Sequence, residues 1–222
     1  MKKLGLIVNP IAGMGGRVGL KGTDGQNIME QAVALGATPL SPERARLALR
    51  QLAPLRDQLV VVTYPGAMGE EEARDCDLEV KVLPRTAVGA TTAEDTREAA
   101  RRLLAEGADL ILFAGGDGTA RDIVAAVGEN VVAAGIPTGV KMHSAVYASS
   151  PAKAGELALN YLLGKAAQVQ EAEVMDIDEE AFRQGTVTAR LYGYLRVPYQ
   201  RQYLQGAKTA SPQNENAAKD AI

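Results

Sequence analysis

The sequence contains no tryptophan, only two phenylalanines and a single cysteine. With so few large aromatic side chains, a stacking platform for single-stranded nucleic acid is not expected. The core must instead consist of Val, Leu, Ile and Ala, which suits parallel strands covered by helices on both faces. Because Cys76 is alone, an intrachain disulfide and a cysteine-based metal cage are excluded, and a reducing compartment is favoured.

The sequence also lacks a strong excess of one charge sign and long apolar runs. Its 24 basic and 27 acidic residues are interspersed and give a formal net charge of −3, so no basic stripe faces a nucleic acid or an anionic membrane. The apolar run Leu4–Val8 meets Asn9 and Pro10 before it reaches signal-peptide length, and no uncharged run could span a bilayer. We expect a cytoplasmic protein with neither nucleic-acid nor membrane partners.

Over the first 165 residues, short apolar runs alternate with stretches of helical periodicity. The expected strands are Leu4–Val8, Leu59–Thr63, Glu79–Leu83, Asp109–Ala114 and Ile136–Val140. The expected helices are Pro42–Leu55, Ala93–Ala105, Thr119–Val127 and Pro151–Leu163, with Ser41 and Ser150 as N-caps for two of them. The alternation predicts an α/β fold with a doubly wound, mostly parallel sheet, in which ligands bind at the carboxyl ends of the strands.

The pattern changes after Lys165. Val169–Asp178 and Thr186–Val197 have the composition of strands, and Glu179–Arg183 that of a helical turn. We expect residues 1–165 to form the α/β domain, residues 166–208 to begin a β-rich second unit, and residues 209–222 to form a disordered or truncated tail. The long strand and the apolar helices need covering, which favours a homodimer.

The strongest chemical signal is the turn Gly115–Thr119, with the sequence Gly-Gly-Asp-Gly-Thr, between an apolar strand and a helix. Glycines allow a ligand to approach the backbone closely, and the N–H groups at the start of a helix bind anions such as phosphate. Asp117 repels phosphate, so we expect it to meet a hydroxyl or a metal. The alternative is a tight connection in which Asp117 only caps the helix.

A second glycine-rich loop, Asn9–Gly25, follows the first strand. It matches neither the Walker A spacing nor the dinucleotide G-x-G-x-x-G register, in which Val18 occupies the last position. With the cations Arg17 and Lys21, the loop could wrap a polyphosphate. It could equally close over a protein partner.

His143 is the only histidine, and it follows the last expected strand together with Lys141 and Ser144. That position favours contacts with phosphate or ribose, although a loop histidine satisfied by its own backbone is the alternative. Four carboxylates are weaker candidates for a metal, because Mg²⁺ prefers oxygen ligands: Asp24, Asp122, Asp176 and Asp178. The last two also suit a helix start.

Taken together, these segments resemble the NAD kinase and diacylglycerol kinase superfamily, and more narrowly its ATP-NAD kinase-like branch, which includes acetoin-catabolism protein X. The segments that carry the resemblance are Asn9–Gly25, Gly115–Asp122, Gly135–Ala148 and Glu173–Pro198. The resemblance implies an N-terminal domain of the NAD kinase type and the use of ATP, Mg²⁺ and NAD. By it, Asp117 would activate or position the acceptor hydroxyl, and the nucleotide would be held by Gly115, Gly116, Gly118 and Thr119, with Asn9, Pro10, Gly13, Gly15 and Gly16 in the first loop.

Three hypotheses follow. The first is an ATP-dependent kinase that phosphorylates a hydroxyl, with NAD as the acceptor suggested by the resemblance. The second is a nucleotide-binding regulatory or accessory protein without turnover, with a link to acetoin catabolism; it is favoured because the Asn-Glu pair of NAD kinases occurs here only as Asn214-Glu215 in the tail. The third is an interaction protein that keeps the fold with a degenerate pocket.

Overall fold

A computed structural model describes residues 1–13, 38–85, 89–139, 142–166, 168–177, 188–200 and 203–204. The main sheet has five parallel strands in the order β3-β2-β1-β4-β5. Their bounds are β1 Lys2–Val8, β2 Leu59–Thr63, β3 Glu79–Val82, β4 Leu110–Gly115 and β5 Ala133–Pro137. The predicted α/β fold with a parallel sheet is therefore confirmed.

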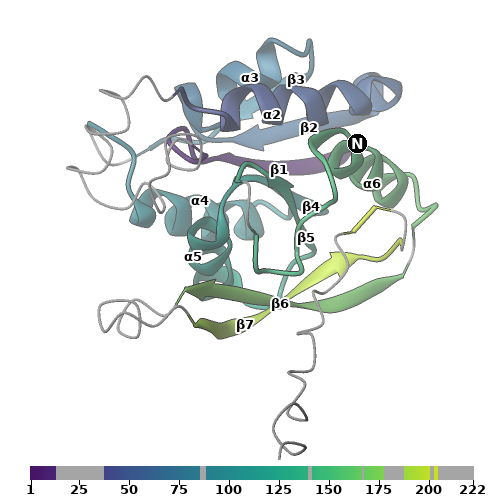
Figure 1. Cartoon of the computed structure of the whole chain (residues 1–222). Helices are drawn as coiled ribbons and strands as arrows, with labels where there is room; N and C mark the ends of the chain where they lie inside the picture. Colours follow the sequence, from purple (N-terminus) through teal and green to yellow (C-terminus); the bar gives the residue numbers. More distant parts are fainter. Residues whose placement is uncertain are drawn as a thin grey trace, which may run out of the picture.

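Helices cover both faces of this sheet (Figure 1). The α-helices are α2 Ser41–Leu49, α3 Glu70–Arg74, α4 Ala93–Ala105, α5 Asp117–Val127 and α6 Pro151–Leu162. Between α2 and α3 lie the 3-10 helices η2 Arg50–Gln58 and η3 Gly66–Met68. Side chains of β1 alternate between the two layers: Leu4 and Leu6 pack with α2 and α6, whereas Ile7 packs with α4 and α5. The resulting core is aliphatic and lies on both sides of the sheet.

An antiparallel pair follows the last helix. Its strands are β6 Val169–Ile177 and β7 Ala189–Pro198, and their buried side chains Ala172, Val174, Leu195 and Val197 join the core layer of α4 and α5. In Figure 1 the pair runs beside α5 and the edge strand β5. The division into domains at residues 165 and 208 stays a prediction, and the tail and Glu179–Arg183 lie outside the described residues.

Two local predictions were wrong for physical reasons. Ser41 is not an N-cap: α2 begins at Ser41 itself, and its buried hydroxyl donates a hydrogen bond to the carbonyl of Ala12 at 2.8 Å, a tertiary contact. The expected helix Pro42–Leu55 also changes into 3-10 geometry at Arg50, ahead of Pro54, which has no N–H for a helical hydrogen bond. The predicted cap Ser150 is confirmed, because its side chain accepts the N–H of Lys153 at 3.2 Å.

The edge strand β5 begins three residues earlier than expected. Ala133, Ala134 and Gly135 are small and carry little strand propensity, so the sequence pattern starts only at Ile136. A small residue is required at Gly135, since a Cβ there would come within 2.3 Å of the Tyr147 ring. Packing, not propensity, determines where this strand starts. No helix within the described ranges is long and apolar enough to cross a membrane.

Candidate functional site

The strand order places a topological switch point between β1 and β4. From β1 the chain builds the sheet outward through β2 and β3 on one side, and then through β4 and β5 on the other. The connections that leave the carboxyl ends of β1 and β4 therefore run to opposite faces and open a crevice between them, where open parallel sheets bind their ligands. Both glycine-rich segments begin at this crevice.

The Gly115–Thr119 turn is shorter than the sequence indicated. Gly115 is the last residue of β4, Gly116 is the N-cap, and α5 begins at Asp117 rather than at Thr119. The N–H groups of Thr119 and Ala120 both donate to the carbonyl of Gly116, at 2.9 and 3.1 Å. The N–H groups of the first two helical residues have no acceptor within the helix, so this end of α5 favours an anion.

The two central glycines have different surroundings. A Cβ at Gly115 would lie 2.3 Å from the Thr119 Oγ1, so only glycine lets the first turn of α5 fold back on β4. A Cβ at Gly116 would meet nothing within 4 Å. The space above Gly116 is therefore open to a ligand, whereas Gly115 is required by packing.

Asn9 joins the two connections. Its side-chain amide donates to Thr119 Oγ1 at 3.1 Å, and its Oδ1 accepts the N–H of Ile11 at 3.3 Å. Its backbone N–H donates to the carbonyl of Ala114 at 2.9 Å. Asn9 thus holds the end of β1 against the first turn of α5, across the switch point.

The start of the first loop packs against the end of β5. Gly13 has a φ of +85°, and a Cβ there would come within 2.5 Å of the Thr138 carbonyl oxygen. The Thr138 hydroxyl is fully buried and has no hydrogen-bond partner among the described residues. Pro10, between Asn9 and this contact, is partly buried. The predicted loop residues Gly15 and Gly16 lie outside the described residues.

Asp117 is held by the segment that follows β5. Its Oδ1 accepts the backbone N–H of Ser144 at 3.0 Å, and its Oδ2 accepts that of His143 at 2.8 Å. The Nδ1 atom of the His143 ring lies 3.2 Å from the same Oδ2. Asp117 is only 9% exposed. The structure thus brings together Asp117, His143 and Ser144, three residues named from the sequence.

The Ser144 hydroxyl serves the protein itself. It donates to the carbonyl of Met175 at 2.8 Å and accepts the N–H of Met175 at 3.0 Å, which attaches the segment after β5 to β6. Lys141 lies outside the described residues.

The metal candidates are engaged in ion pairs. Asp122 pairs with Arg97 at 3.0 Å, and Asp176 pairs with Arg121 at 3.0 Å. Asp24 and Asp178 lie outside the described residues. In the part of the chain that the structure describes, no group of three or more His, Cys, Asp or Glu side chains could hold a metal ion.

Two side chains near the site were not predicted from the sequence. The fully buried Tyr147 donates its hydroxyl to the Gly116 carbonyl at 2.5 Å, and burial, with the nearby charges of Asp117 and Asp176, raises the pKa of Tyr147 well above its ordinary value. Arg44 of α2 donates to the Pro137 carbonyl at the end of β5, at 2.7 Å. No local motif marks either residue, because both contacts join distant parts of the chain.

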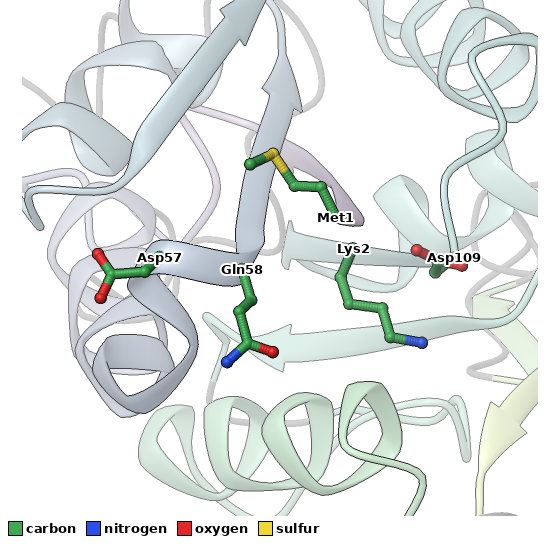
Figure 2. Close-up of a pocket in the computed structure, with 5 residues that line it drawn as sticks. All are labelled: Met1, Lys2, Asp57, Gln58 and Asp109. Atoms are coloured by element: carbon green, nitrogen blue, oxygen red, sulfur yellow. The ribbon is translucent and has the colours of Figure 1, made fainter.

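A separate hollow of about 430 Å³ lies at the opposite edge of the sheet, lined by Met1, Lys2, Asp57, Gln58 and Asp109 (Figure 2). These residues adjoin the amino ends of β1, β2 and β4. Ligands of open parallel sheets bind at the carboxyl ends instead. This hollow is therefore not part of the candidate site.

Comparison with known proteins agrees with this geometry. A family model described as ATP-NAD kinase N-terminal domain matches residues 4–166. The matched region contains β2 to β5 and all of β1 except its first two residues, together with Asn9, the turn Gly115–Thr119 and His143. No curated protein and no solved structure matches the chain.

Proposed function

The chain belongs to the family of the ATP-NAD kinase N-terminal domain and is thus a kinase-like nucleotide-binding protein; from this premise we propose that it transfers the γ-phosphoryl group of ATP to a hydroxyl group, with NAD as the acceptor. The observation that supports this most directly is the open N-terminus of α5 at Gly116, beside the switch point. Phosphoryl transfer depends mainly on positioning and charge stabilisation, which such a site can supply.

In this proposal each part of the site has a separate task. The N–H groups at the start of α5 bind the phosphates, with Gly115, Gly116, Gly118 and Thr119 giving the backbone the required shape. Asn9, Pro10 and Gly13, at the start of the first loop, would close the pocket from the side of β1. Gly15 and Gly16, which lie outside the described residues, are proposed to bind the same nucleotide. Lys141 offsets charge that develops on the transferred group, and Ser144 holds its segment in place. The acceptor hydroxyl would bind beside Asp117 and His143.

Mg²⁺ fits this site only as a companion of the nucleotide. The described residues offer no carboxylate cage, and Asp122 and Asp176 are already paired with arginines. Mg²⁺ usually keeps several waters and binds through substrate phosphates with one or two carboxylates. When bound, it would neutralise charge on the phosphates.

The decisive experiment is a calorimetric titration of the chain with ATP and with NAD, each with Mg²⁺, repeated on Asp117→Asn. We expect binding of both nucleotides and an affinity change of at least about tenfold in the variant, equivalent to about 1.4 kcal/mol. A phosphoryl-transfer assay follows. The matched control is Asp109→Asn, because Asp109 accepts a backbone N–H of Lys3 at 2.8 Å at the far edge of the same sheet. If neither nucleotide binds, the proposal fails.

One observation favours a second candidate, a nucleotide-binding regulator without turnover. Both carboxylate oxygens of Asp117 accept backbone N–H groups, as a purely structural aspartate would. Nucleotide binding without any phosphoryl transfer would support this regulator and exclude the kinase. The link to acetoin catabolism, the cytoplasmic location and the homodimer stay predictions from the sequence.

A further inference from the structure

Asp117 is poorly placed to take a proton by itself. The backbone N–H groups of His143 and Ser144 donate to its carboxylate, and the Nδ1 atom of the His143 ring lies 3.2 Å from Oδ2. These donors belong to one segment of the protein and hold both oxygens. A carboxylate that is buried and engaged in this way is better suited to orient a neighbour than to react with a substrate.

His143 is that neighbour, and its ring is the accessible member of the pair. The His143 side chain is 38% exposed, whereas that of Asp117 is 8% exposed. Nδ1 lies 3.2 Å from Asp117 Oδ2. Because an ionised carboxylate can only accept, a neutral ring in this contact places its hydrogen on Nδ1 and its lone pair on Nε2, at its other end. This is the arrangement in which a carboxylate fixes the tautomer of a general base.

The other charges near this pair offset one another. Asp176 of β6 lies close enough to Tyr147 to raise its pKa together with Asp117. Asp176 is itself paired with Arg121 of α5 at 3.0 Å. Among the described residues, Asp117 is the charged group in direct contact with the His143 ring.

We infer that His143 is the general base for the proposed phosphoryl transfer and that Asp117 is its positioning residue. The inference rests on the proposed function and adds the group that accepts the proton. The acceptor hydroxyl gives its proton to Nε2 of His143, while its oxygen forms a bond to the γ-phosphorus of ATP. The bond from that phosphorus to the β–γ bridging oxygen breaks, and ADP leaves with the electron pair. The imidazolium, stabilised by Asp117, then returns its proton to water.

The first test compares His143→Asn with wild type in the transfer of phosphate from ATP to NAD. The asparagine amide can still donate toward Asp117, so the contact between the segment after β5 and the start of α5 is kept. No atom remains at the position of Nε2. General base catalysis contributes about 100-fold or more, so kcat should fall by at least that factor while nucleotide affinity changes less than about threefold.

The second test uses the fact that the chain has a single histidine. In protein prepared without a histidine tag, ¹⁵N–¹H correlation spectra of the imidazole report His143 alone. We expect the Nδ1–H tautomer in wild type and loss of that preference in Asp117→Asn. This readout does not depend on turnover.

The outcomes separate the two proposals. If wild type transfers phosphate and His143→Asn retains its kcat, the inference about His143 is wrong and the proposed function stands. A predominant Nε2–H tautomer in wild type also overturns the inference. If wild type binds nucleotides without transferring phosphate, the kinase proposal and the inference fall together.

Discussion

The side-chain amide of Asn9 donates a hydrogen bond to Oγ1 of Thr119 at 3.1 Å, across 110 residues of sequence. This bond connects the end of β1 to the first turn of α5, on the two sides of the switch point. Thr119 is buried and also packs over Gly115. The position of this end of α5 therefore depends on Asn9.

Replacing Asn9 with alanine should weaken ATP binding more than it weakens the fold. The loss of one partly buried hydrogen bond costs about 1 kcal/mol of unfolding free energy, whereas the released helix end should lower ATP affinity by about tenfold or more. Calorimetry and urea denaturation measure the two effects. Asn130→Ala is the control, because the Asn130 amide bonds to the Val127 carbonyl at 2.9 Å at the other end of α5. Equal ATP affinity in the two variants would contradict the role given to Asn9.

The glycines of the turn should separate packing from binding. Gly116→Ala adds a methyl group in open space at an ordinary φ of −104°, so stability should change by less than about 1 kcal/mol. The same methyl group should obstruct a phosphate at the start of α5 and lower ATP affinity. Gly115→Ala should instead destabilise the protein by about 1–3 kcal/mol, because its Cβ meets Thr119. Unchanged ATP affinity in Gly116→Ala would exclude a phosphate at this position.

Two buried tyrosines allow a matched test of how much the hydrogen bond from Tyr147 to the Gly116 carbonyl stabilises the fold. Tyr147→Phe removes the hydrogen bond to this carbonyl and should cost about 1 kcal/mol of unfolding free energy. Tyr64 is equally buried, but its hydroxyl has no hydrogen-bond partner among the described residues. Tyr64→Phe should therefore be neutral or stabilising. Thermal unfolding of both variants decides; an equal loss of stability in the two would show that the bond of Tyr147 has no special value.

The sequence predicted those features of the site that depend on neighbouring residues in the chain. The apolar run before Gly115 and the glycines after it are contiguous, so a strand, a turn and a helix could be predicted in one place. The Asp117 carboxylate and the His143 ring meet across 26 residues, and no short-range pattern reports such a contact. The sequence placed both residues at the same edge of the sheet, but not in hydrogen-bonding distance of each other.

Tertiary contacts also explain the errors. Serine is a common N-cap residue, yet the Ser41 hydroxyl donates to the carbonyl of Ala12. A local sequence pattern could not indicate this contact. Helix α5 starts two residues earlier than predicted. The sequence did not indicate this, because Asp117 and Gly118 are poor helix formers and the N-cap Gly116 has no capping side chain. Tyr147 and Arg44 reach the site from elements whose sequences carry no motif for it.

The last prediction concerns Glu72 of α3, which is fully buried. Neither carboxylate oxygen has a hydrogen-bond partner among the described residues, and the nearest cation, Arg46, is 3.7 Å away. Burial therefore raises the pKa of Glu72 above its ordinary value of 4.5, despite the attraction of Arg46. A carboxyl group with a raised folded-state pKa favours the folded state while it is protonated. This stabilisation is lost as the pH rises through the folded-state pKa.

Glu72→Gln should consequently be more stable than wild type at neutral pH, because its side chain stays uncharged where the buried carboxyl group would have to ionise. The advantage should shrink as the pH falls toward 4.5, because wild-type Glu72 then becomes neutral as well. Arg46 keeps its closer partner Asp75, at 2.8 Å, so the substitution leaves no unpaired guanidinium. Urea denaturation across this pH range measures the difference, with the exposed neighbour Glu71→Gln as control. A variant that is less stable than wild type at neutral pH would contradict the prediction that burying this carboxyl group is a net cost to folding.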